Sequence, residues 1–313
     1  MEIDALIKNI AEEKKKAETD LHSAEGLLRL QKVASQYQGE YKLIWSHDLL
    51  EEIKKRPKRE PVKTHILSLD DEIKGFHEQQ LITISAHSKH GKTAFALFLM
   101  KNLEALSPVM IPLEQSNEEL VEQLNDNGYP IPRFLSPEKL ASKVTADWIE
   151  QRVIEGIAKY NTKLVVIDHL GYIDTLGNYE QNRRENLAYR IGEVMRQLKG
   201  IAKRWNVIII LLVHISQKND ATPPRLEDIK NSSDILQESD MVIMLWRKNE
   251  GKGAVKIWKN DTLVSVMANR RTGKNCNIGL VFNSKTGEYD EMPKMQDWVK
   301  QMEELAKTAD DDF

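Results

Sequence analysis

Seven short apolar runs are the feature of this 313-residue sequence that most constrains its fold. Within each run the hydrophobic residues are continuous rather than alternating with polar ones, which is typical of strands buried on both faces of a parallel sheet. Stretches with the periodicity of amphipathic helices separate the runs. We therefore predict an α/β fold, in which a twisted, mostly parallel sheet is flanked by helices. The runs are LITIS (81–85), VMIPLE (109–114), LVVID (164–168), VIIILLVH (207–214), MVIMLW (241–246), LVSVMAN (263–269) and IGLVFN (278–283).

The last two runs are joined by the short connection TGKNC, which predicts a hairpin at the end of the sheet. The clearest helix precedes the fourth run, and one of its faces carries the apolar residues Leu187, Ile191, Val194, Leu198 and Ile201. The charged residues of this helix are expected to lie mostly away from that face. They are Arg190, Glu193, Arg196, Lys199 and Lys203.

A change of pattern near residue 60 divides the chain. The earlier part is rich in Glu, Lys, Ala and Leu at helical spacing, including the stretch Leu43–Ile53, and KKRPKREP (54–61) then breaks the helix at its two prolines. We predict a helical N-terminal region and linker over 1–62, the α/β domain over 63–291, and a C-terminal helix with an acidic tail over 292–313. The Phe-ended tail is interpreted as a solvated chain end, with a docking peptide as the alternative.

Charge and cysteine content exclude several classes of protein. The formal net charge of −3 is too near zero for a protein that coats nucleic acid, so any such contact must come from a local cluster of cations. A single cysteine, Cys276, excludes a disulfide framework and a multi-cysteine zinc module, and fits a reducing cytosol. The first residues are polar, unlike a signal peptide, and the longest apolar run, 207–213, is too short to span a bilayer. We expect a cytoplasmic protein.

The triplet Gly91-Lys92-Thr93 lies between the first apolar run and a helix-forming stretch. In this context it predicts a phosphate-binding loop, in which backbone N–H groups at the helix N-terminus hold a β-phosphate. Lys92 would neutralise phosphate oxygens, and Thr93 would offer its hydroxyl to Mg²⁺. Ala86 takes the place of the usual first glycine, a replacement that is tolerated wherever φ stays negative.

The expected ligand of this loop is ATP, or another nucleoside triphosphate, together with Mg²⁺. Gly91 is required because a Cβ there would crowd the phosphate or forbid the turn. The side chains of His87 and His90 are expected to point outward. The predicted nucleotide-binding residues are Ala86, His87, Ser88, Lys89, His90, Gly91, Lys92 and Thr93.

Two acidic residues at strand ends complete the predicted nucleotide site. Asp168 ends the third run, where a carboxylate can hold the water shell of Mg²⁺. Glu114 ends the second run, where a carboxylate can act as general base toward the attacking water. Either acid alone is interpreted as a solvated strand end, but both together with the phosphate loop predict an NTP hydrolase. Pro112 is unusual in a central strand and is expected to shorten the second strand or to create a bulge.

From about residue 65 to 291 the sequence resembles the DnaB-like hexameric helicases of replication, with their RecA-type motor domain. The pattern is closest to that of phage primase-helicase motors, and the family's phosphate loop often begins with alanine, as here. The similar segments occur in the family's order: SAHSKHGKT for the phosphate loop, IPLEQS for the catalytic glutamate, LVVIDHLGYI for the metal aspartate, VIIILLVHIS with its preceding helix for the γ-phosphate sensor, DIKNSSDILQESDMVIMLWR for the DNA-binding loop, and ANRRTGKNCNIGLVFNSKTGEYDE for the closing hairpin with the arginine finger.

The resemblance implies further catalytic residues. His214 would sense the γ-phosphate, at a position that is usually glutamine in the bacterial enzymes and histidine in the phage primase-helicases. Arg270 would enter the site of the neighbouring subunit as an arginine finger, with the adjacent Arg271 as a rival. The family's lysine-any-arginine signature maps onto 268–270, so the lysine position is Ala268 and one trans cation is missing. The candidates to replace it are Arg271 and Lys274.

Contact with DNA is implied by the resemblance rather than by composition. The segment 215–235 mixes cations with acids, and by composition it is interpreted as a solvated loop. Its similarity to the family's pore loop assigns DNA binding to Lys218, Arg225, Lys230, Asn231 and Ser232. Secondary candidates, with a solvated helix start as an equal alternative, are Arg183 and Arg184.

The activity implied by the resemblance is that of an ATP-dependent replicative DNA helicase, a ring of six subunits that translocates 5′ to 3′ on single-stranded DNA and unwinds the duplex at the fork. The implied partners are single-stranded DNA, further copies of this chain, and a separate primase, polymerase or helicase loader in a bacterial or phage-infected cell. No membrane partner is implied. Two alternatives stay open: a RecA-type recombination or repair ATPase, and a weakly hydrolysing DnaB-like loading or scaffold protein, which Ala268 favours.

Overall fold

The computed structural model describes residues 43–55, 60–173, 187–215, 222–229, 232–250 and 257–291. The chain divides into two units, residues 1–59 and 60–313. In the first unit the predicted helical stretch is confirmed as α3 (Ser46–Lys55). The large apolar side chains of this helix and of the residues before it are exposed: Leu43, Ile44, Trp45, Leu49, Leu50 and Ile53. The predictions for residues 1–42 and for the tail over 292–313 fall outside the described residues.

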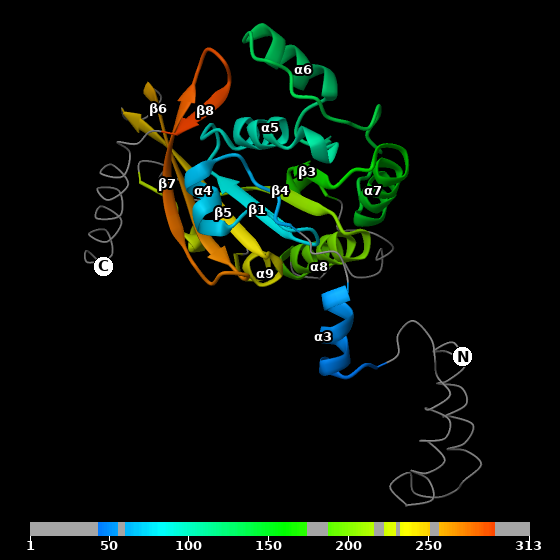
Figure 1. Ribbon diagram of the computed structural model, residues 1–313. Coiled ribbons are helices and arrows are strands. Elements are labelled where there is room, and N and C mark those ends of the chain that lie inside the picture. Colours follow the sequence, from blue (N-terminus) through cyan, green and yellow to red (C-terminus); the bar gives the residue numbers. More distant parts are fainter. Residues whose placement is uncertain are drawn as a thin grey trace, which may run out of the picture. The chain divides into compact units, whose positions relative to one another are not determined.

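The second unit is built on one eight-stranded sheet with the order β2-β3-β4-β1-β5-β6-β7-β8 (Figure 1). The pairs from β2 to β5 are parallel and those from β5 to β8 are antiparallel, which confirms a mostly parallel sheet. All seven predicted runs form strands. The strands are β1 (Leu81–Ala86), β2 (Val109–Pro112), β3 (Leu164–Asp168), β4 (Ile208–His214), β5 (Met241–Glu250), β6 (Ile257–Asn269), β7 (Cys276–Asn283) and β8 (Glu288–Glu291).

The predicted hairpin is confirmed as β6 and β7, but it does not end the sheet. The strand β8, with the sequence EYDE, pairs antiparallel with β7 and forms the edge. No apolar run marks this strand, since Tyr289 is its one buried side chain. A strand of this kind leaves no hydrophobic pattern from which it could be predicted.

Helices cover both faces of the sheet, as continuous apolar strands require (Figure 1). Alternate residues of β1 enter two cores: Ile82 and Ile84 pack in the first, and Leu81 packs in the second. The first core also contains residues of α4 (Leu67–Ile73), α5 (Lys92–Asn102) and α6 (Asn117–Asp126). The second contains residues of α7 (Ala146–Tyr160), α8 (Leu187–Trp205) and α9 (Ser232–Glu238). Short 3₁₀ helices lie in the connections: η1 (Glu104–Leu106), η2 (Leu170–Tyr172) and η3 (Leu226–Asp228).

The predicted apolar face of α8 is confirmed, because Val194, Leu198 and Ile201 are buried. One residue expected to lie away from that face is also buried: Lys199 is 8 % exposed. The prediction was wrong for this side chain because its amine forms an ion pair with Asp240 rather than meeting solvent. Within the described part of the chain, no helix is long and apolar enough to cross a membrane.

The edge strand β2 explains how a proline fits into the sheet. The strand ends at Pro112, two residues before the predicted end at Glu114. At an edge, the missing N–H of proline interrupts no ladder between central strands. The amides of Leu113 and Glu114 both donate to the carbonyl oxygen of Asp168, at 2.5 and 3.1 Å. The segment that carries Glu114 is thereby tied to the end of β3.

Candidate active site

The site residues meet at the carboxyl ends of the parallel strands. The ends of β1, β3 and β4 are in register, so that Ala86 pairs with His214 and Leu212 pairs with Asp168. These strand ends and the segment after β2 surround a cavity of about 290 Å³. The structure thus brings together the predicted phosphate loop, both acids and the sensor histidine. The cavity is lined by His87, Ser88, Lys89, Gly91, Lys92, Thr93, Ala94, Glu114, Gln115, Gln123, Asp168 and His214.

The turn into α5 depends on its glycine, as predicted. Gly91 precedes the helix with a φ of 85°, in the left-handed region that favours glycine. A Cβ at this position would also lie 2.7 Å from the hydroxyl oxygen of Tyr289, which donates to the carbonyl oxygen of Gly91. Ala86 is not among the residues with positive φ, which is why alanine is accepted in place of the usual first glycine.

The two histidines of the loop do not point outward. His87 and His90 are 5 % and 0 % exposed, so that prediction was wrong. Nδ1 of His90 accepts a hydrogen bond from the backbone N–H of Arg247 at 2.9 Å, which ties the loop to β5. The side chain of His90 does not line the cavity, and that of Ala86 packs in the first core. For these two predicted nucleotide-binding residues, only the backbone is placed to contribute.

Lys92 and Asp168 are buried, and each has a polar atom without a hydrogen-bond partner in the described part of the chain. Nζ of Lys92 and Oδ1 of Asp168 have no hydrogen-bond partner among the described residues. Burial lowers the pKa of Lys92 to about 8, against the opposing effect of the Asp168 and Glu114 carboxylates. Burial raises the pKa of Asp168, and the Thr93 hydroxyl, which donates to Oδ2 at 2.7 Å, opposes this rise. An unpaired amine, a carboxylate oxygen and a hydroxyl in one cavity fit a phosphate chain with a divalent cation.

A cluster of three side chains lies across the cavity from the loop. Oε2 of Glu114 lies 3.2 Å from Nε2 of His214 and 3.9 Å from Nε2 of His169. The two imidazole rings meet edge to face, with centroids 4.2 Å apart. This arrangement places an acceptor for a proton next to two ring nitrogens, as a site that activates water requires.

His169 is a site residue that sequence analysis missed. Its Nδ1 accepts a hydrogen bond from the N–H of Gly171 at 3.0 Å, which leaves Nε2 as the protonated nitrogen of the neutral ring. Burial, followed by the charges of His214 and Lys92, lowers its pKa to about 4. The ring is therefore neutral at pH 7 and directs an N–H toward Glu114. Its position directly after Asp168 is the signal from which it could have been found.

Arg270 lies at the opposite end of the sheet, where the parallel strands begin. It follows Asn269, which pairs with Met241 at the start of β5, and its amide donates to the carbonyl oxygen of Asp240 at 2.8 Å. The amide of Asp240 donates in turn to Leu81, the first residue of β1. The length of β1, roughly 17 Å at about 3.3 Å per residue, separates this end of the sheet from the phosphate loop. The exposed side chain of Arg270 is too short to reach the cavity of its own chain.

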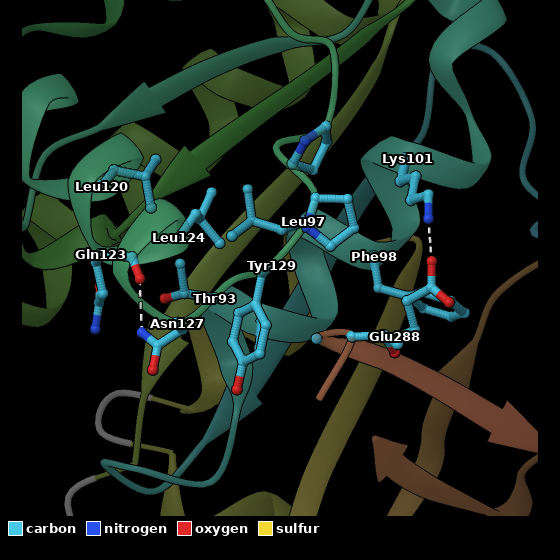
Figure 2. Close-up of a pocket in the computed structure, with 15 residues that line it drawn as sticks. Thr93, Leu97, Phe98, Lys101, Leu120, Gln123, Leu124, Asn127, Tyr129 and Glu288 are labelled. Atoms are coloured by element: carbon cyan, nitrogen blue, oxygen red, sulfur yellow. Dashed lines mark hydrogen bonds and ion pairs between the residues drawn. The ribbon is translucent and has the colours of Figure 1, made fainter. Parts of the chain in front are cut away.

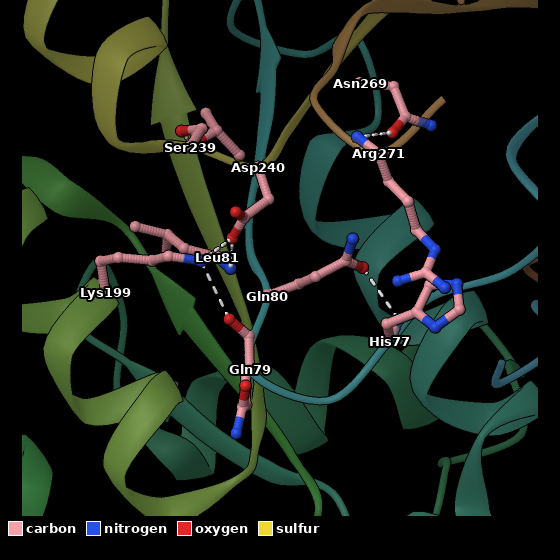
Figure 3. A network of polar contacts seen from close by, with 10 residues as sticks. His77, Gln79, Gln80, Leu81, Lys199, Ser239, Asp240, Asn269 and Arg271 are labelled. Atoms are coloured by element: carbon pink, nitrogen blue, oxygen red, sulfur yellow. Dashed lines mark hydrogen bonds and ion pairs between the residues drawn. The ribbon is translucent and has the colours of Figure 1, made fainter. Parts of the chain in front are cut away.

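The other candidate cations, Arg271 and Lys274, lie on the same turn as Arg270. Arg271 is directed toward His77 (Figure 3), and burial followed by the charge of Arg271 lowers the pKa of that histidine. Arg271 and Lys274 are both exposed in the turn between β6 and β7, whereas Ala268 is half-buried in β6. Two cations therefore stand on the same turn as Arg270, near Ala268, the position at which the resemblance predicted a lysine.

The segment predicted to bind DNA begins and ends beside His214, the predicted sensor. Ile215, which follows His214, forms a bridge with Ile229, so the two ends of the intervening loop meet next to the cavity. Within the loop, the amide of Arg225 donates to Oδ2 of Asp228 at 2.6 Å. Ser232 is the first residue of α9. The other predicted DNA-binding residues fall outside the described residues: Lys218, Lys230, Asn231, Arg183 and Arg184.

A second cavity, of about 170 Å³, lies between α5, α6 and the turn before β8 (Figure 2). It shares Thr93 with the first cavity, but its wall is mainly apolar, with Leu97, Phe98, Leu120 and Leu124 among the lining residues. Such a wall offers few donors to a triphosphate. The cavity beside Lys92 is therefore the candidate nucleotide site.

In the parallel part of the sheet, a phosphate loop follows β1 and an aspartate ends β3, with β4 between these two strands. This arrangement defines a P-loop protein of the RecA-like class. The chain belongs to the family of the DnaB-like helicase C terminal domain, which it matches over residues 61–132 and 139–291. The predicted resemblance is thereby confirmed.

Named relatives agree with this family. The chain is 25 % identical over 289 residues to the replicative DNA helicase DnaB of Rickettsia typhi, covering 74 % of this chain and 57 % of the relative. It is 26 % identical over 279 residues to the replicative DNA helicase DnaC of Bacillus subtilis, covering 77 % and 59 %. The chain thus spans little more than half the length of these relatives.

Two solved structures share the fold. The ATPase domain of a phage helicase superposes with a TM-score of 0.64 at 19 % identity, covering 79 % of this chain and 96 % of that domain. A DnaB-like replicative helicase, described with its interactions with primase, superposes with a TM-score of 0.63 at 18 % identity, covering 92 % and 75 %. The RecA-like fold is confirmed by both.

Proposed function

We propose that this chain is the motor of an ATP-dependent replicative DNA helicase, a ring of six copies that moves 5′ to 3′ on single-stranded DNA. One observation carries the proposal: one cavity is lined by Lys92, Thr93, Asp168, Glu114 and His214, whereas Arg270 lies at the other end of the parallel strands. Because Arg270 cannot reach the cavity of its own chain, a neighbouring copy would supply the arginine that completes each site. Family membership supports the same assembly.

Within one protomer, each side chain has a defined task in hydrolysis. Lys92 neutralises β- and γ-phosphate oxygens, which its unpaired buried amine favours. Thr93 and Asp168 would hold Mg²⁺, which supplies neutralisation of phosphate charge when bound. Glu114 accepts the proton of the attacking water, and the N–H of His169 next to it helps to orient this carboxylate.

Coupling to DNA follows from the chain that leaves β4. His214 contacts Glu114 at 3.2 Å, and the next residue, Ile215, closes the loop whose segment carries the proposed DNA-binding residues. Loss of the γ-phosphate would free His214 to move, and this movement would pass directly into the loop. One cation and a few amides in each copy, repeated around the ring, would suffice to track a single strand.

Contacts between copies are supported by α3. Its apolar side chains and those of the residues just before it are exposed, with Trp45 82 % and Ile53 52 % exposed. Exposed apolar clusters of this kind mark interaction surfaces. We propose that a neighbouring protomer covers this face in the ring. A separate primase, polymerase or loader would complete the assembly at the fork, as the primase interactions described for one structural relative suggest.

Unwinding of a forked DNA duplex tests the proposal. The purified chain with ATP and Mg²⁺ is expected to displace the labelled strand of a fork with a 5′ single-stranded arm, and electron microscopy is expected to reveal closed rings. Filaments on DNA without unwinding would favour a recombination ATPase instead. Assembly on DNA with neither unwinding nor DNA-stimulated hydrolysis would favour the loading or scaffold alternative.

Nucleotide binding is expected to take up a proton above pH 8. The free site holds Lys92 with its pKa lowered to about 8, and a phosphate beside Nζ would return it toward its usual value of 10.5. Binding at pH 8.5 should then take up roughly 0.7 proton, against about 0.1 at pH 7, so affinity falls as pH rises above 8. Calorimetry in two buffers of different ionisation enthalpy measures this number. Equal uptake at the two pH values would contradict the assignment.

A further inference from the structure

A largely buried ion pair joins Lys199 to Asp240, the residue before β5 (Figure 3). Asp240 stands between α9 and β5, and its Oδ2 accepts hydrogen bonds from the N–H of Leu81, at 2.7 Å, and from Nζ of Lys199. The same amine donates to the carbonyl oxygen of Gln79 at 3.0 Å. Lys199 comes from α8, so one contact joins three segments that are far apart in the sequence.

The backbone of Asp240 extends this contact to the arginine. Its N–H donates to the carbonyl oxygen of Leu81, and its carbonyl oxygen accepts from the N–H of Arg270, each at 2.8 Å. Asp240 is therefore held on one side by Leu81 and Lys199 and holds the start of the β6–β7 turn on the other. The buried Ser239 strengthens this attachment, because its hydroxyl oxygen lies 2.7 Å from that of Thr83 in β1.

The turn around Arg270 is shaped by Asn269. Asn269 Oδ1 accepts from the amides of Arg271 and Thr272, at 3.0 and 3.3 Å, and so shapes the turn after Arg270. The side chain of Arg270 is exposed. Beside the pairing of Asn269 with Met241, the contact of the Arg270 amide with Asp240 links the finger to the body of the sheet.

We propose that Lys199 and Asp240 are positioning residues that hold Arg270 where it can act on the nucleotide of the neighbouring protomer. The inference rests on the proposed function, since it needs Arg270 to act in trans. The burial of Lys199 on an otherwise apolar helix face calls for an explanation, because taking its charge out of water is unfavourable and an exposed lysine avoids this penalty. Placement of a transition-state group within a fraction of an ångström supplies one.

The test uses Lys199→Met, which keeps the length of the side chain and removes its charge. Alone, this variant is expected to lose about 10²-fold in kcat with little change in KM, as a misplacement of about 1 Å can cause. Circular dichroism checks that it folds. If it does not, Asp240→Asn, which keeps an acceptor oxygen for Leu81, takes its place in the same measurements.

Mixing distinguishes positioning from a general loss of stability. Lys92→Ala protomers have a defective nucleotide site but an intact finger, so in an equal mixture with Lys199→Met about a quarter of the sites combine two intact halves. The mixture is expected to recover about a quarter of wild-type ATPase activity, well above either variant alone. The mixture of Lys92→Ala with Arg270→Ala is the control for a shared site.

The outcomes separate the two proposals. Recovery in both mixtures supports them both. Recovery with Arg270→Ala but not with Lys199→Met, or wild-type kcat for Lys199→Met alone, overturns the positioning role and leaves the shared site standing. Recovery in neither mixture overturns the shared site itself, and with it the positioning role.

Discussion

Replacement of Arg270 by alanine is expected to lower kcat for ATP hydrolysis by about 10³-fold or more, since arginine fingers contribute ~10³–10⁵ to turnover. KM should change little, because the guanidinium acts on charge that develops in the transition state. Arg270 lies where the parallel strands begin, and its backbone N–H donates to Asp240, so its side chain is placed to act on another copy. Steady-state ATPase assays with saturating single-stranded DNA measure both constants.

The control for this variant is Arg271→Ala. Arg271 stands on the same turn but is directed toward His77, so its loss is expected to leave kcat within a few-fold of wild type (Figure 3). An equal loss in the two variants would instead mean that both cations act, with Arg271 in the role of the missing lysine at Ala268. A loss confined to Arg271→Ala would contradict the assignment of Arg270.

The fold was predictable where burial dictates sequence. Strands covered on both faces are mostly apolar, so β1, β3 and β4 were visible as continuous hydrophobic runs. The nucleotide site was predictable in part for the related reason that the carboxyl ends of parallel strands lie together, which placed Asp168 beside the phosphate loop. His214, at the end of β4, was predicted from the family resemblance. Here the sequence pattern and the geometry are two forms of the same constraint.

What escaped prediction depends on contacts between distant segments. The burial of Lys199 depends on Asp240, 41 positions later in the chain, and that of His90 depends on the backbone of Arg247. The role of His169 depends on Gly171 and on Glu114, from the segment after β2. Helical or strand periodicity describes one element at a time, so a polar side chain that is buried by a partner elsewhere is assigned to solvent.

Replacement of Glu114 by glutamine is expected to lower kcat by about 10²–10⁴-fold, the usual contribution of a general base, while nucleotide binding is retained. The amide has the shape of the carboxylate and can still contact His214, which lies 3.2 Å from Oε2, but it cannot take the proton of the attacking water. Single-turnover hydrolysis and the equilibrium affinity for a fluorescent ATP analogue separate the two effects.

The matched control is Glu118→Gln, an exposed glutamate in the first turn of α6, only four positions along the chain. It makes the same change of charge close to the site but does not line the cavity, so kcat should stay within about twofold of wild type, as surface substitutions usually allow. A Glu114→Gln enzyme with normal kcat would transfer the base to another group. A variant that lost nucleotide affinity instead of kcat would mean that the carboxylate acts in binding, because a group used only in the transition state leaves the ground state unchanged.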